Sequence, residues 1–123
     1  MTDKQQQLIA ELEKFTKDDI EFYEFSFLWV DVKISRGVKF MAESCSSYFL
    51  IYSILNHLDD LLEIDSDHQI WTLKKINDKC WQLICSDKTG RRLCGEEFST
   101  CDFPLDEIKI LLISGRLLLP SEF

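Results

Sequence analysis

The feature that most constrains the fold is a long helical pattern in the middle of the chain. From Val38 to Leu58, apolar side chains recur every three or four residues, the spacing that places them on one face of an α-helix. Serine favours helix caps, so Ser44, Ser46 and Ser47 allow either one long helix or a helix pair. Most of the core should pack on this element. Its apolar members include Met41, Ala42, Cys45, Tyr48, Phe49, Tyr52 and Leu55.

Three segments after this pattern predict an antiparallel β-meander. Residues 68–76, 80–86 and 91–99 are rich in strand-forming side chains and are separated by short turn sequences. Successive side chains of a strand point to opposite faces of the sheet. Trp71 and Leu73 therefore lie on the same side, and we expect that side to be the buried one.

The first third of the chain predicts a helix and then a strand. Residues 3–14 carry apolar side chains at helical spacing, with Thr2 in the position of an N-cap. Residues 24–35 form a run of β-branched and aromatic side chains, which predicts a strand. A turn is expected at residues 35–37.

The last part of the chain allows two interpretations. Pro104 followed by acidic residues fits the first turn of a helix, Gly115 fits its end, and residues 116–119 would form a final short strand. The alternative is a hairpin over residues 108–119 that turns at Ser114 and Gly115. The whole chain, residues 1–123, is predicted to be a single α+β domain. In it, a small antiparallel β-sheet packs against the central helix or helix pair, with an N-terminal helix and, from the first interpretation, a C-terminal helix-strand unit.

Composition limits the partners of this chain. Its 22 acidic and 14 basic side chains give a formal net charge of −8, which repels nucleic-acid phosphates and anionic membranes and attracts basic surfaces. The start of the chain has no secretory signal, and no apolar stretch approaches the roughly 20 residues of a membrane span. We therefore expect a cytoplasmic protein that binds neither nucleic acid directly nor a membrane.

Residues that could carry chemistry are few. The five cysteines form no C-x-x-C pair, which in a cytosolic protein predicts reduced thiols. His57 and His68 are not spaced with them as ligands of a structural zinc site are. The chain has neither a G-x-S-x-G nucleophile motif nor a glycine-rich nucleotide loop. We therefore expect no metal, no cofactor and no catalytic residues.

Two acidic clusters are the candidate binding residues. Either could imitate a run of phosphates and occupy the basic nucleic-acid groove of another protein, and the alternative is that both are only solvated. The first cluster lacks the ligand order of an EF-hand calcium loop. The members are Asp59, Asp60, Glu63, Asp65 and Asp67 in the first cluster, and Asp18, Asp19, Glu21 and Glu24 in the second.

Three sequence blocks are distinctive when they are taken together. They are a G-V-K-aromatic-x-A-E block that begins at Gly37, the D-F-P-L block at residues 102–105 and the L-L-L-P-S-E-aromatic tail at residues 117–123. In this order they resemble a family of small uncharacterised bacterial proteins often carried on plasmids and phages, over roughly residues 36–123. That family has no assigned activity, so the resemblance implies a mobile-element context and no catalytic role.

Three functions remain open at this point. We expect a non-enzymatic, acidic protein that inhibits or sequesters another macromolecule, such as a nucleic-acid-handling protein of a bacterial defence system, in the manner of an anti-CRISPR. The second hypothesis is a structural adaptor or homo-oligomerising subunit that uses Phe25, Phe27 and Trp29 as its contact. The third is an enzyme of unrecognised type.

Overall fold

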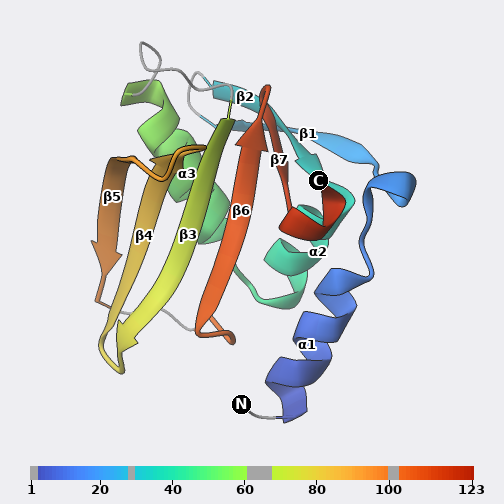
Figure 1. Cartoon of the computed structure of the whole chain (residues 1–123), viewed down its shortest axis with the longest axis horizontal. Coiled ribbons are helices and arrows are strands. Elements are labelled where there is room, and N and C mark those ends of the chain that lie inside the picture. The colour runs from blue at the N-terminus through green and yellow to red at the C-terminus, as the bar shows by residue number, and fades with distance from the viewer. Residues whose placement is uncertain (1–2, 28–29, 61–67, 100–102) are drawn as a thin grey trace.

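A computed structural model describes residues 3–27, 30–60, 68–99 and 103–123 and confirms the α+β fold (Figure 1). Within these residues, seven strands form one sheet in the order β1-β2-β7-β6-β3-β4-β5. Neighbouring strands are antiparallel, except that β2 and β7 run parallel. The strands are β1 (Phe22–Phe27), β2 (Val30–Ser35), β3 (His68–Asn77), β4 (Cys80–Asp87), β5 (Arg92–Phe98), β6 (Glu107–Ile113) and β7 (Arg116–Leu118).

The predicted meander is confirmed as strands β3, β4 and β5, and so is its buried face. Trp71 and Leu73 are 1% and 0% exposed. A helix covers this face: in Figure 1 the second of the two central helices, labelled α3, lies behind β3 and β4, and the face of β3, β4 and β5 toward the viewer carries no helix. Phe49, from the second of the two central helices, contacts Phe98 of β5 edge to face, with ring centroids 5.8 Å apart. The core therefore lies between one face of the sheet and the helices.

The central helical pattern forms a helix pair, α2 (Arg36–Ser44) and α3 (Tyr48–Asp60), and not one long helix. The break is at Ser46, whose φ of 51° is left-handed and ends α2. Ser47 then bonds two carbonyl groups of α2, because its N–H donates to the Ala42 carbonyl at 2.9 Å and its hydroxyl to the Met41 carbonyl at 3.3 Å. Both helices bury an apolar face against the sheet.

The run over residues 24–35, predicted as one strand, folds as the two antiparallel strands β1 and β2. The turn predicted at residues 35–37 is wrong, because α2 begins at Arg36 directly after β2. Ser35 is its N-cap, and the Ser35 hydroxyl accepts a hydrogen bond from the Val38 N–H at 3.1 Å. A serine that ends a strand can therefore also start a helix, with no loop between them.

The helix predicted after Pro104 is also wrong, and the hairpin alternative is confirmed. Strands β6 and β7 are joined by Ser114 and Gly115, whose φ values of 52° and 77° are typical of a tight two-residue hairpin. In β6 the buried side chains Ile108, Ile110 and Leu112 alternate with exposed Glu107 and Lys109, although Leu111 is buried as well. This period of two prevailed over the local signal of a proline followed by carboxylates.

The N-terminal helix is confirmed as α1 (Asp3–Glu13), while its predicted cap, Thr2, lies outside the described residues. Leu12 is buried, and Gln5 Nε2 donates to the Pro104 carbonyl at 2.9 Å. The hydroxyl of Ser121 donates to the Leu12 carbonyl at 3.3 Å. These contacts hold α1 against the C-terminal third of the chain. None of the helices in the described ranges is long and apolar enough to cross a membrane.

A short helix, η2 (Pro120–Glu122), places a buried carboxylate at the start of α2. Glu122 is 2% exposed. Its Oε1 accepts hydrogen bonds from the Ser35 hydroxyl at 2.5 Å and the Leu119 N–H at 2.9 Å, and its Oε2 accepts one from the Gly37 N–H at 3.1 Å. Burial of a carboxylate is costly unless donors surround it, and a helix N-terminus adds favourable partial positive charge. The hydrogen bonds of Glu122 therefore hold η2 against the junction of β2 and α2.

Replacing Glu122 by alanine is expected to lower the free energy of unfolding by about 3 kcal/mol, because three buried donors lose a charged acceptor. Urea denaturation measures this change. The matched control is Glu97→Ala, at an exposed position of β5, with an expected effect within about 0.5 kcal/mol. An equal loss in the two variants would contradict the structural role of Glu122.

Replacing Gly37 by alanine should destabilise the protein, although alanine in a helix is ordinarily better than glycine by about 1 kcal/mol. An added Cβ would lie 2.6 Å from Glu122 Oε1 and 2.7 Å from Leu119 Cδ1, which forces a shift that costs roughly 1–3 kcal/mol. The control Ser44→Ala, at the exposed end of α2, should change little. The cost at Gly37 should fall in the Glu122→Ala background, and strictly additive effects would argue against the contact.

The turn between β4 and β5 supports a pH-dependent prediction. Asp87 Oδ1 accepts hydrogen bonds from the Thr89 hydroxyl at 2.6 Å and from the Thr89 and Arg91 N–H groups at 2.9 Å. The Thr89 hydroxyl first, and then the Arg91 N–H, hold the pKa of the Asp87 carboxyl below its usual range. A carboxyl whose pKa is lowered by folding stabilises the protein above its unfolded pKa of about 3.9, and this stabilisation is lost as the pH falls through the folded pKa.

Asp87→Asn should therefore melt at a lower temperature than the wild type at neutral pH, and the difference should shrink as the pH falls below about 4. Thermal melts across this pH range measure the effect. Asp106→Asn, at an exposed position, serves as the control. A difference between wild type and Asp87→Asn that stays constant with pH would show that the carboxylate is not the stabilising form.

Candidate functional site

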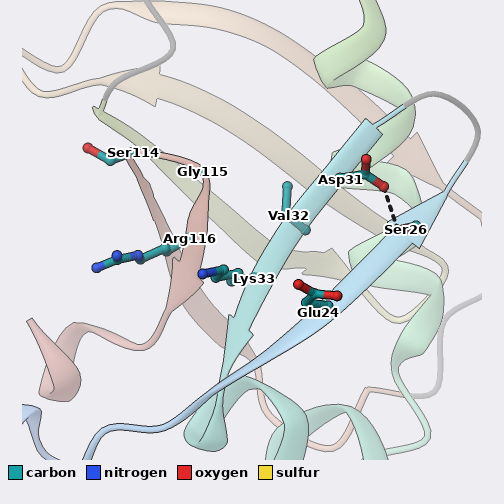
Figure 2. A pocket seen from close by; sticks show the side chains of 8 residues that line it. All are labelled: Glu24, Ser26, Asp31, Val32, Lys33, Ser114, Gly115 and Arg116. Carbon is teal, nitrogen blue, oxygen red and sulfur yellow. Dashed lines mark hydrogen bonds between the residues drawn. The ribbon is translucent and has the colours of Figure 1, made fainter.

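A polar pocket of about 480 Å³ lies where β1 and β2 meet the turn of the β6–β7 hairpin (Figure 2). It combines two acidic and two basic side chains, and most of its lining comes from strands. Its position is therefore fixed by the backbone hydrogen bonds of the sheet. The lining residues are Glu24, Ser26, Asp31, Val32, Lys33, Ser114, Gly115 and Arg116.

The register of the strands explains why the charged groups meet. Glu24 of β1 lies directly opposite Lys33 of β2, and Lys33 in turn is paired with Arg116 of the parallel strand β7. The Lys33 N–H donates to the Gly115 carbonyl at 3.0 Å, which brings the hairpin turn against β2. One row across three strands thus carries an acidic and two basic side chains.

The acidic half of the pocket consists of Glu24 and Asp31. The Ser26 hydroxyl donates to Asp31 Oδ1 at 2.5 Å, the contact dashed in Figure 2, so the aspartate is held in place. Glu24 is exposed and, in the part of the chain that the structure describes, no basic nitrogen lies within 4.0 Å of its carboxylate. This half can accept hydrogen bonds from a cationic group.

The basic half consists of Lys33 and Arg116, which extend in the same direction in Figure 2. The guanidinium carbon of Arg116 lies 5.1 Å from the centroid of the Phe22 ring, a cation–π contact that orients it. Among residues 3–27, 30–60, 68–99 and 103–123, no carboxylate lies within 4.0 Å of either cation. Like charges on neighbouring strands repel each other, and a carboxylate bound between them would relieve this repulsion.

One member of the second acidic cluster of the sequence, Glu24, lines this pocket. Asp18 and Asp19 belong to the short helix η1 (Lys17–Asp19), Glu21 precedes β1, and Glu24 lines the pocket. Asp18 and Glu21 are exposed, and Glu21 Oε2 accepts a hydrogen bond from the Tyr23 hydroxyl at 3.3 Å. We call Asp18, Glu21 and Glu24 the acidic segment.

The first acidic cluster lies elsewhere. Asp59 and Asp60 are the last two residues of α3, whereas Glu63, Asp65 and Asp67 lie outside the described residues. The end of α3 and the start of β1 are on opposite sides of the molecule in Figure 1. The C-terminal end of α3 therefore lies away from the pocket.

Sequence reasoning found Glu24 but missed Asp31, Lys33 and Arg116. The alternation of Asp31 and Lys33 with buried Val32 and Ile34 was a readable sign of an outward-facing row on β2. The sequence gives no sign of Arg116, because only the parallel pairing of β2 with β7 brings it there.

The aromatic contact surface proposed from the sequence is partly internal. The Phe25 ring stacks on Tyr48 at 6.1 Å between centroids and meets Tyr52 at 5.5 Å, so it packs against α3. Phe27 ends β1, and Trp29 lies outside the described residues. Phe25 therefore serves the interface between sheet and helix.

A second cluster of polar side chains lies between α3 and the sheet. His57 Nε2 and Glu96 Oε2 are 2.9 Å apart, and the His57 ring lies 5.8 Å from the Trp71 ring. Trp71 Nε1 donates to Gln69 Oε1 at 3.1 Å. Gln69 is 0% exposed, and its Nε2 has no hydrogen-bond partner among the described residues. This chain of contacts joins α3 to β3 and β5.

The thiols and the metal-binding side chains show no activated arrangement within the described ranges. Burial raises the pKa of the Cys45 thiol to about 11 and also raises that of Cys85. A nucleophilic thiol is activated by a lowered pKa instead. No group of three or more His, Cys, Asp or Glu side chains among the described residues is arranged to hold a metal ion.

The sequence matches the model of a family of unknown function, DUF6876, over residues 6–123. The chain therefore belongs to this family, and the match includes most of α1, β1 and β2 as well as the blocks from Gly37 onward. No curated protein and no solved structure shows a significant match.

Proposed function

We propose that this member of the DUF6876 family is a non-enzymatic binding protein that inhibits or sequesters another protein, and that the partner docks on the polar pocket and the acidic segment. The observation that carries this proposal is the presence of both charge signs in one pocket built on strands. Nucleic acids and anionic membranes present only negative charge, which Glu24 and Asp31 would repel. A protein surface supplies both signs.

The net charge of −8 favours a partner whose surface is basic overall. Basic side chains of that partner would lie along the acidic segment and reach Glu24 and Asp31. A carboxylate of the partner would bind between Lys33 and Arg116, where the two cations are close and lack a counter-ion among the described residues. Ion pairs of both kinds, with acidic and with basic groups of this chain, would fix how the two protein surfaces align.

The resemblance to proteins carried on plasmids and phages is the reason for placing the partner among nucleic-acid-handling proteins of bacterial defence. These proteins have the basic grooves that an acidic protein would occupy, and blocking one of them in the cytoplasm would be an anti-CRISPR-like role. The first acidic cluster, with Asp59 and Asp60 at its start, would contribute a separate contact in this proposal.

Neutralising the acidic half of the pocket, with Glu24→Gln and Asp31→Asn, is expected to weaken the complex roughly 2- to 30-fold, since each exposed ion pair contributes about 0.2–1 kcal/mol. The partner would be captured from bacterial lysate, identified by mass spectrometry, purified, and titrated by calorimetry against each variant. Neutralising the basic half, with Lys33→Gln and Arg116→Gln, should weaken binding by a similar factor. Raising the salt concentration should weaken the wild-type complex as well.

The matched control carries Lys79→Gln and Glu97→Gln, two exposed changes outside the pocket, and should bind as the wild type does. A separate variant that neutralises the first acidic cluster shows whether that cluster contributes. Binding that is indifferent to both halves of the pocket and to salt would overturn the docking surface. Light scattering that shows a stable homo-oligomer with no foreign partner would favour the structural-subunit hypothesis instead.

A further inference from the structure

We propose that Cys85 and Cys94 form a reversible disulfide that cross-links the edge strand β5 to β4. The two residues are directly opposite each other in the antiparallel pair of β4 and β5. Residues opposite each other in such a pair have Cα atoms about 4.5–5.5 Å apart, which lies within the 4.4–6.8 Å that a disulfide spans. Side chains of directly opposite residues lie on the same face of the sheet, with Cβ atoms about 4.5–5.5 Å apart. The two thiol groups are therefore neighbours without any change of register.

The two thiols differ in access to an oxidant. Cys85 is 0% exposed, whereas Cys94 is half-buried on the edge strand. A small disulfide such as oxidised glutathione would therefore react first with Cys94. The Cys94 thiolate attacks one sulfur of the small disulfide, a mixed disulfide forms, and one small thiolate leaves. The Cys85 thiol then attacks the Cys94 sulfur, loses its proton to solvent in this step and expels the second small thiolate.

The electrons and protons balance in these two steps. The protein loses two thiol hydrogens and two electrons as its S–S bond forms, and the small disulfide is reduced to two thiols. Thiol reductants run the same steps in reverse. A pair of this kind suits a protein of a reducing compartment, where disulfides are transient and respond to the redox state.

The cross-link would affect more than its own two residues. The ladder is irregular beside the pair, between Cys85 and Ser86, and β5 is held on one side only, because it ends the sheet. Glu96, two residues beyond Cys94, contacts His57 of α3. A covalent bond between β4 and β5 would therefore hold the sheet edge and its contact with α3 more firmly.

The test treats the folded full chain with oxidised glutathione and measures its intact mass and its free thiols. The expected result is the loss of two hydrogens and of two thiols, reversed by dithiothreitol. Peptide mapping of a Cys80→Ser, Cys101→Ser variant assigns the bond, because trypsin then leaves residue 85 and residue 94 as the single cysteines of their fragments. Amide hydrogen exchange in β5 should become slower in the oxidised protein.

Two single variants complete the test. Cys94→Ser should abolish the cross-link, and Cys80→Ser, the matched control, should retain it. A product that stops as a mixed disulfide on Cys94, a bond to Cys45 or Cys80, or a cross-link that forms only in denaturant would each overturn the proposal. If Cys94→Ser fails to fold, mapping the bond in the Cys80→Ser, Cys101→Ser variant decides the question alone.

Discussion

The carboxylate of Glu122 is the interaction on which the rest of the architecture depends. It accepts hydrogen bonds from Ser35, Gly37 and Leu119, and it does so at the N-terminus of α2, where buried negative charge is best tolerated. Gly37 leaves the space that this contact occupies. The G-V-K block and the L-L-L-P-S-E tail are therefore two halves of one contact, although 85 residues separate Gly37 from Glu122.

This contact also explains how the sheet stays in one piece. Strand β7 has three residues and pairs with β2 through Lys33 with Arg116 and Ile34 with Leu117. Two such pairs are a weak connection between the β1–β2 ribbon and the remaining strands. Because η2 follows β7 closely, the bonds of Glu122 hold β7 beside β2. The basic half of the pocket exists only where these two strands run side by side.

The sequence predicted the helices and strands that have a regular spacing of apolar residues. It missed the contacts that depend on pairing between strands far apart in the chain. Helical spacing located α1 and the α2–α3 pair, and alternation located β3, β4 and β5. Pro104 and the carboxylates after it led to the wrong prediction of a helix, because residues typical of a helix start are weaker evidence than the alternation of apolar residues that β6 buries. Glu24 was identified from its charge, whereas Arg116 could not be, since nothing in the order of residues reveals a parallel pair.

Net charge and pocket charge act over different distances. At physiological salt the field of an acidic surface fades within about 8 Å, so a charge of −8 favours encounter with any basic surface and selects none of them. Selection needs groups at fixed separations, and the strands supply these: Glu24, Lys33 and Arg116 keep the spacing of one sheet row. A count of acidic residues cannot distinguish a recognised carboxylate from a solvated one. In the proposed docking surface, the position of Glu24 beside Lys33 and Arg116 would make that distinction, because a partner would have to match both charge signs at once.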